Sequence, residues 1–368
     1  MDDTKKAALE NDRFSNQKLP TIGEIKAAIP KECFDKNLPV SLGYMFWDFF
    51  VTYLLYKFEP YFEMAGLPGL VFWYFIVGME LSSIFCIGHD CGHGTFSNYT
   101  WVNDLVGHLT HGMIFAPYWP WQKSHRQHHT YTSHVQKDMG HPWITEKKNE
   151  GRNDFDRFAG SSIFTAPFRW VVYTVGGFPD GSHFWPWSGL FKTTTERIQC
   201  VVSCTVCVAF AAAAYVYLGT FGAFVKFYVI PVLAHSFWLI MITYLQHQTD
   251  DIHVYEDGTW NYVKGNLQTI DRPYGFGIDQ MMHHITDGHV AHHFFFTTIP
   301  HYHLMEATAA IQKKLEPYGV YRKESSWDFI WKFATISNRL QYLLGEGTGL
   351  LTYPVNQAIH NTNNNKRD

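Results

Sequence analysis

The hydrophobic residues of this chain are concentrated in four long segments that are separated by polar sequence. A mostly apolar helix of about 20 residues is needed to cross the hydrocarbon core of a membrane, and each segment is long enough to do so. The segments form two pairs, and short glycine-containing turns at 66–69 and 219–222 join the members of each pair. The pattern therefore predicts an all-α membrane protein made of two helical hairpins. The predicted spans cover about residues 42–62, 70–87, 198–218 and 223–245.

The sequence between the two hairpins is more polar. Residues 101–119 are moderately apolar but contain Asp104 and two histidines, so we expect an interfacial or re-entrant helix that is too polar to span the membrane. Residues 120–196 are polar and rich in Trp and Pro. Four spans place this insertion and both ends of the chain on one side. That side carries nearly all the Lys and Arg, so the positive-inside rule predicts that it is cytosolic.

The ends of the chain complete the predicted domain organisation. The first residues are polar and have no apolar core, so we expect no cleavable signal peptide. The expected divisions are a cytosolic N-terminal tail (1–38), a membrane domain whose cytosolic helical cap holds the chemistry (39–345) and a polar C-terminal tail (346–368).

Composition changes this picture mainly through histidine. The formal net charge of −4 gives no reason to expect a nucleic acid as a partner. The chain has 21 His against 29 Lys and Arg, and this number of histidines is several times what an ordinary domain carries. So many imidazoles are typical of metal or proton chemistry.

Eight of the 21 histidines fall in three closely spaced clusters, and these are the main candidates for metal or proton chemistry. One follows the second predicted span, one lies in the middle insertion and one lies in the C-terminal part. Spacings of three and four residues place the imidazoles of a cluster on one side of a helix. The predicted topology also puts all three clusters on the same side of the membrane. The eight histidines are His89, His93, His125, His128, His129, His289, His292 and His293.

Eight imidazoles exceed what one zinc ion takes and fit two metal ions with about four ligands each. Imidazole alone does not choose between iron, zinc, copper and nickel. His247, at the end of the fourth span, is the predicted ninth ligand, and His283 is a weaker candidate. His235 lies roughly 18 Å along the helix from His247, so we expect it to form a hydrogen bond inside the bundle. The histidines expected to have supporting or structural roles are His108, His111, His134, His141, His301 and His303.

The three clusters, in this order around four spans, resemble the histidine boxes of the integral-membrane fatty-acid desaturases. The resemblance covers roughly residues 20–345. The strings that carry it are Gly-His89-Asp-Cys-Gly-His93-Gly, Trp-Gln-Lys-Ser-His125-Arg-Gln-His128-His129 and Ile-Thr-Asp-Gly-His289-Val-Ala-His292-His293-Phe. They are similar to the methyl-end branch, which holds the Δ12 and omega-3 desaturases. The string Asp-Gly-Ser-His-Phe-Trp-Pro at 180–186 looks closest to nematode-type Δ12 members.

The resemblance implies that the eight box histidines and His247 bind two iron ions and that O2 is the co-substrate. The implied product is a cis double bond in an acyl chain, at Δ12 (oleoyl to linoleoyl) or alternatively at the omega-3 (Δ15) position. The acyl carrier, phospholipid or CoA, stays open. Acyl-CoA Δ9 relatives have Asn where this chain has Thr243, four residues before the ligand at the end of the fourth span.

The resemblance also implies an electron source and a location. The sequence contains no His-Pro-Gly-Gly haem motif, so we expect electrons from a separate cytochrome b5 and its NADH reductase. The implied location is the endoplasmic reticulum membrane, with several passes and both termini in the cytosol.

Other functions are compatible with parts of the pattern. A hydroxylase, ketolase or conjugase could use the same centre. A metal-binding transporter or receptor would carry ionisable residues along its spans near the midplane, whereas these clusters lie outside the predicted spans. A zinc hydrolase would have no use for so many ligands. Oxidation is favoured because an unactivated methylene needs a strong oxidant, which acid and base groups cannot supply.

Overall fold

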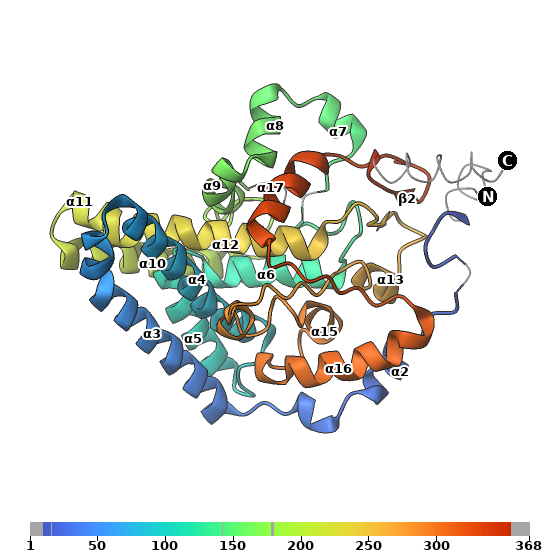
Figure 1. The fold of residues 1–368 in the computed structure, drawn as a ribbon, viewed down its shortest axis with the longest axis horizontal. Coiled ribbons are helices and arrows are strands. Elements are labelled where there is room, and N and C mark those ends of the chain that lie inside the picture. Colours follow the sequence, from blue (N-terminus) through green and yellow to red (C-terminus); the bar gives the residue numbers. More distant parts are fainter. Residues whose placement is uncertain (1–9, 16, 142, 178–179, 355–368) are drawn as a thin grey trace.

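The computed structural model describes residues 10–15, 17–141, 143–177 and 180–354. Long helices form a bundle, and shorter helices and loops cover one end of it (Figure 1). Four helical stretches are long and apolar enough to cross a membrane. They are α3 (Leu38–Met64), α4 (Gly66–His93), α10 (Thr194–Leu218) and the continuous stretch of α11 (Phe221–Phe224), η4 (Val225–Val229) and α12 (Ile230–His247).

The shorter elements lie between and after these helices, and one antiparallel strand pair places Val254 opposite Leu351. Before and between the hairpins are α2 (Ile22–Ala28), η1 (Lys31–Phe34), α5 (Thr100–Met113), α6 (Tyr118–Thr130), α7 (Glu146–Glu150), α8 (Asp154–Ser161), η2 (Ile163–Thr165), α9 (Ala166–Val171) and η3 (Val172–Gly177). After the second hairpin are β1 (Val254–Tyr255), α13 (Tyr262–Asn266), α14 (Ile278–Met281), α15 (His289–Phe295), η5 (His301–His303), α16 (Leu304–Leu315), η6 (Glu316–Tyr318), α17 (Phe329–Arg339) and β2 (Leu350–Leu351).

The four predicted spans are confirmed as helices, and each observed helix is longer than its predicted span. The largest extension is at the end of α4, which continues to His93 and ends at Gly94, a residue with φ of 73°. Helical hydrogen bonds do not depend on apolar side chains, so the helix continues past the apolar segment. The first histidine cluster therefore lies on the last turns of a spanning helix.

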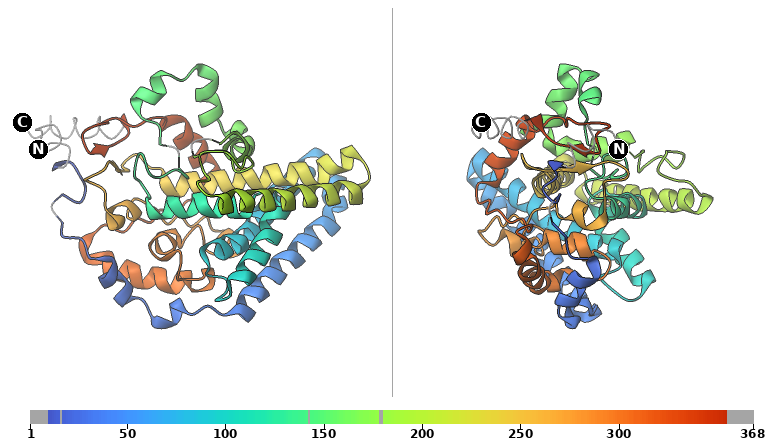
Figure 2. Two further views of the ribbon diagram at one scale, coloured as in Figure 1. Left: turned by 180° about the vertical axis from the view of Figure 1, so that it is seen from behind. Right: turned by 90° about the vertical axis from the view of Figure 1, so that its right-hand side faces the viewer.

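Local sequence explains where the second hairpin begins. The hydroxyl of Thr193 accepts a hydrogen bond from the backbone N–H of Glu196, and the Glu196 carboxylate accepts one from the backbone N–H of Thr193. This capping box starts α10, and Gly219 ends it with φ of 74°. Along most of its length α10 is exposed, and it lies to one side of the other spans in the right-hand view of Figure 2.

α4 of the first hairpin packs tightly against α12. A Cβ atom added at Gly78 would lie 2.6 Å from the backbone of Ala234, so only glycine allows this close approach. The indole of Trp238 donates a 2.8 Å hydrogen bond to the carbonyl of Phe75 across the same interface. The contact places the ends of α4 and α12 beside each other.

The predicted helix at 101–119 is observed as two elements. α5 has 14 residues, which is too short to span, and a separate helix, α6, begins at Tyr118. α6 and α15 lie beside the ends of α4 and α12, while α2 packs on α16 (Figure 1). Residues 1–9 and 16 of the predicted N-terminal tail and residues 355–368 of the predicted C-terminal tail lie outside the described residues.

Candidate metal centre

The three histidine clusters and the end of α12 meet in the interior of the protein. Two groups of imidazoles have ligand nitrogens close enough to share a metal ion, within 4.8 Å of one another in each group. The first group contains His89, His93, His125, His129 and His292. The second contains His128, His247 and His293.

Helix geometry explains how α6 supplies both groups. His125 and His129 are four residues apart and point the same way, with their Nε2 atoms 3.0 Å apart. His128 precedes His129 by one residue, which is about 100° around the helix, so it points to the second group. There its Nε2 lies 3.2 Å from Nε2 of His247.

The third cluster divides in the same way along α15. His292 joins the first group, where its Nε2 lies 3.1 Å from Nε2 of His129. His289 and His293 are four residues apart and both face the second group. Nε2 of His289 lies 3.1 Å from Nε2 of His247. With His289 the second group has four imidazoles, and the first group has five.

The protonation of these imidazoles fits metal binding. Burial, together with the neighbouring imidazoles, holds the pKa values of His125, His129, His292 and His293 well below the ordinary value, and lowers that of His289 to about 3. Neutral imidazoles are the form that binds metals.

The nitrogen contacts themselves favour a cation. A neutral Nε2 carries either one proton or one lone pair, yet Nε2 of His129 faces two other Nε2 atoms, and so does Nε2 of His247. Hydrogen bonds cannot satisfy both contacts well. Nε2 of His293 has no hydrogen-bond partner among the described residues. Lone pairs that converge in this way fit two metal ions, with five and four nitrogen donors.

Comparison with known proteins identifies the family. The model for "Fatty acid desaturase" matches residues 65–326. This chain belongs to the fatty acid desaturase family. It is 49% identical over 350 residues to the "Delta(12) fatty acid desaturase" of Caenorhabditis elegans, covering 93% of each chain. It is 42% identical to the "Omega-3 fatty acid desaturase" of the same organism, covering 95% of this chain and 87% of the relative. An "Omega-6 fatty acid desaturase, endoplasmic reticulum" of Brassica juncea is 35% identical over 81% of this chain and 82% of its own length.

Family membership makes this chain an oxidoreductase that desaturates acyl chains. The desaturase has an acyl lipid as its substrate and is associated with the membrane, in agreement with its four apolar helices. The expected enzyme class and the all-α membrane fold are therefore confirmed. A histidine cluster that could bind metal is present as expected.

One residue that the sequence did not single out supports His128. Asp138 is buried, and one of its carboxylate oxygens lies 2.7 Å from Nδ1 of His128. The carboxylate also accepts hydrogen bonds from the backbone N–H of Ser133 at 3.0 Å and from the indole of Trp143 at 3.3 Å. Asp138 is thus fixed from several sides and leaves Nε2 of His128 facing the second group. No spacing rule marks this loop residue in advance.

His293 is supported by neutral groups instead. Its Nδ1 lies 3.1 Å from the hydroxyl of Thr132 and 3.3 Å from the amide oxygen of Asn266. These contacts orient the ring so that Nε2 faces the second group. Outer contacts of this kind hold ligand imidazoles in position and set which nitrogen is free to bind.

Glycines of the first box allow the close packing around the first group. A Cβ atom at Gly88 would lie 1.9 Å from Nδ1 of His111, and one at Gly92 would lie 2.8 Å from the ring of Trp121. The Trp121 ring stacks on His125 with 4.6 Å between centroids. The glycines that flank the box histidines thus let α5 and α6 approach α4.

The weaker candidate His283 lies outside both groups. Its Nε2 is 2.8 Å from a carboxylate oxygen of Asp48 on α3, and its ring lies 4.5 Å from that of His301. His301 in turn places Nδ1 2.8 Å from the carboxylate of Asp90, the residue that follows His89. These buried side chains connect the first span to the first group.

The remaining histidines have other partners. Nδ1 of His235 lies 2.8 Å from the hydroxyl of Ser82, as expected for a hydrogen bond inside the bundle. Nε2 of His134 lies 3.2 Å from the carboxylate of Asp257. His108 contacts the hydroxyl of Ser203 at 2.9 Å. None of these three is in either group of imidazoles.

Proposed function

We propose that this desaturase introduces a cis double bond at the Δ12 position of an oleoyl chain to give linoleoyl. The nine imidazoles are proposed to hold two iron ions, with five ligands on one ion and four on the other. The observation that carries the metal assignment is the convergence of Nε2 atoms in two adjacent groups. The Δ12 assignment is supported by the 49% identity to a desaturase of that name.

Iron with O2 would supply an oxidant able to remove hydrogen from an unactivated methylene. The residues of this chain have simpler roles. His89, His93, His125, His129 and His292 are proposed to bind one ion, and His128, His247, His289 and His293 the other. Asp138 holds the proton of His128 at Nδ1, so that Nε2 is free to bind. The burial of the imidazoles keeps them neutral and excludes bulk water from the centre.

The alternative position is omega-3 (Δ15). It is supported by the 42% identity to a desaturase with that name. A hydroxylase or conjugase would use the same metal ligands, so product analysis separates these reactions from desaturation. The lower identity makes omega-3 the second candidate.

The proposed location is the endoplasmic reticulum membrane, with both termini and the metal centre on the cytosolic side. The basic residues outside the spans and the name of the Brassica juncea relative support this proposal. Residues 39–345 are proposed to form the membrane domain between two tails. Electrons are proposed to come from cytochrome b5 and its NADH reductase.

Expression in yeast, which makes monounsaturated but no polyunsaturated fatty acids, tests the activity. Double-bond positions in the extracted lipids are read by mass spectrometry. The proposal expects Δ9,12 dienes from endogenous oleate, and fed linoleate should remain unchanged. An omega-3 triene from fed linoleate, with no new diene, would contradict the Δ12 assignment. A hydroxylated product would contradict desaturation itself.

A further inference from the structure

An exposed apolar surface lies beside α12 but outside the four spans. We call it the flank surface and define it by residues of η2, α9, α17 and the segment just before α17. The exposed fractions of Phe164, Trp327 and Trp331 are 82%, 70% and 71%. α9 packs along α12, and α17 packs against α12, α8 and η2 on the same side (Figure 1). The residues are Ile163, Phe164, Phe168, Trp327, Ile330 and Trp331.

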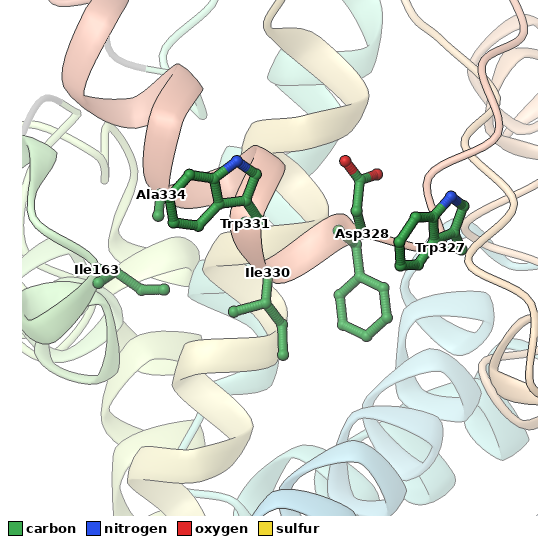
Figure 3. A pocket seen from close by; sticks show the side chains of 7 residues that line it. Ile163, Trp327, Asp328, Ile330, Trp331 and Ala334 are labelled. Atoms are coloured by element: carbon green, nitrogen blue, oxygen red, sulfur yellow. The ribbon is translucent and has the colours of Figure 1, made fainter.

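The flank surface contains a groove. Its volume is about 560 Å³, and two indoles lie on either side of it (Figure 3). Ile163 faces Ala334 and Trp331 across the groove, whereas the carboxylate of Asp328 points away from the isoleucines. Apart from that carboxylate the lining side chains are apolar. The lining residues are Ile163, Trp327, Asp328, Phe329, Ile330, Trp331 and Ala334.

The height of the groove along α12 is fixed by ring contacts. Phe329 lines the groove, and its ring lies 5.6 Å from that of Trp238. Phe333, one turn further along α17, lies 6.2 Å from Phe237. Trp238 precedes His247 by nine residues, which corresponds to about 14 Å along an α-helix. The groove therefore lies beside the middle part of this span, away from the end that carries His247.

That height lies inside the hydrocarbon core. The stretch Phe221–His247 has 27 residues. It is about 40 Å long, and a hydrocarbon core is about 30 Å thick. If the core lies within the length of this helix, it leaves at most about 10 Å uncovered at either end. Trp238 is about 14 Å from the His247 end of the helix and about 26 Å from the Phe221 end. Both distances exceed the uncovered length, so Trp238 lies within the core wherever the core is placed along this helix. Phe329 lies at the same depth.

The occupant of the flank surface follows from this depth. Large exposed apolar patches mark contacts with proteins or membranes. Phe329 of this patch contacts Trp238 of the fourth span, so the patch adjoins that span at the depth of the hydrocarbon core. We propose that the flank surface lies in the bilayer leaflet nearest the metal centre and that its groove holds the acyl chain of a phospholipid. α17 then enters that leaflet beside α12, in addition to the four spans.

Photo-crosslinking of the full-length enzyme in lipid nanodiscs tests this proposal. The probe is a phosphatidylcholine with a diazirine on its acyl chain, and peptides are mapped by mass spectrometry. Labelling of residues 327–334 should exceed labelling of α16 by at least tenfold, because α16 carries the exposed Lys313 and lies in the cap. A water-soluble diazirine should show the opposite preference. Equal labelling of α17 and α16 by the lipid probe would overturn the proposal.

A groove-filling variant separates the groove from the surrounding bilayer. Ala334→Trp adds an indole opposite Ile163, so lipid labelling at Ile163 should fall at least fivefold while labelling of the exposed Trp47 on α3 stays unchanged. Unchanged labelling at Ile163 would overturn occupancy of the groove. Protection of α17 from both probes would overturn the proposal in favour of a protein partner. Ala334 and Ile163 are not among the proposed metal ligands.

Discussion

A carboxylate oxygen of Asp138 lies 2.7 Å from Nδ1 of His128, and both side chains are buried. Asp138 also accepts hydrogen bonds from Ser133 and Trp143, so its position is set by its own loop. The imidazole is therefore held with its proton on Nδ1 and its lone pair on Nε2. That lone pair faces His247 across the second group of imidazoles.

Replacing Asp138 tests this role. We expect Asp138→Asn to lower iron content or desaturation about 10–100-fold, the usual loss when an outer partner of a ligand imidazole is removed. The measurements are iron per purified protein and diene formed in yeast per enzyme. Asp257→Asn is the matched control, because Asp257 is an exposed carboxylate beside His134. Full iron content and full activity in Asp138→Asn would contradict the positioning role.

Two histidines on α12 form a second matched pair. Nε2 of His247 faces the Nε2 atoms of His128 and His289, so His247→Ala should remove a ligand and reduce turnover by more than about 100-fold, beyond the loss typical of an outer partner. His235→Ala should keep its iron and cost about 1 kcal/mol of stability, because Ser82 loses a hydrogen-bond partner. Iron content, product yield and thermal unfolding are measured for both variants. Normal iron and activity in His247→Ala would remove that residue from the ligand set.

The sequence predicted the spans and the candidate ligands because both depend on local spacing. Apolar length predicts a span, and intervals of three and four residues predict one helical side. The division of His128 and His129 between two groups was not predicted. It depends on how α6 is rotated relative to α4, α12 and α15, which is a property of tertiary packing.

Contacts between distant segments were the other part that the sequence could not reveal. Asp138 reaches His128 through an irregular loop that has no period. The position of His283, six residues before the third cluster, makes it a weaker candidate ligand by sequence. The structure instead pairs it with Asp48, which is 235 residues away in sequence and on the first span. Sequence distance thus gave no guide to this pairing.

The glycine beside the first box histidine should be essential for packing. A Cβ atom at Gly88 would lie 1.9 Å from Nδ1 of His111, so Gly88→Ala forces α4 and α5 apart. Overpacking of this kind typically costs about 1–3 kcal/mol, and we expect lower thermal stability together with reduced iron content. Gly43→Ala on α3 is the control, since a Cβ atom there has no neighbour within 4 Å. Equal stability of the two variants would contradict the close packing.

Asp12 should attach the N-terminal segment to the cap in a pH-dependent way. Burial opposes its charge, but hydrogen bonds with His253 and Lys264 outweigh burial and hold the pKa of Asp12 at about 2, below the ordinary 3.8. The Lys264 ammonium lies 2.7 Å from its carboxylate, and the hydroxyl of Tyr255 donates to it at 3.0 Å. A pKa that is lower in the folded state stabilises the fold above pH 3.8, and this contribution is lost as the pH falls towards 2.

Asp12→Asn should therefore unfold at a lower temperature than the wild type at pH 7, and the difference should narrow below about pH 4. Glu10→Gln is the control, because Glu10 is exposed. Thermal unfolding of the detergent-solubilised enzyme at several pH values measures the difference, and a gap that stays constant from pH 7 to pH 3 would show that the Asp12 charge does not provide the attachment.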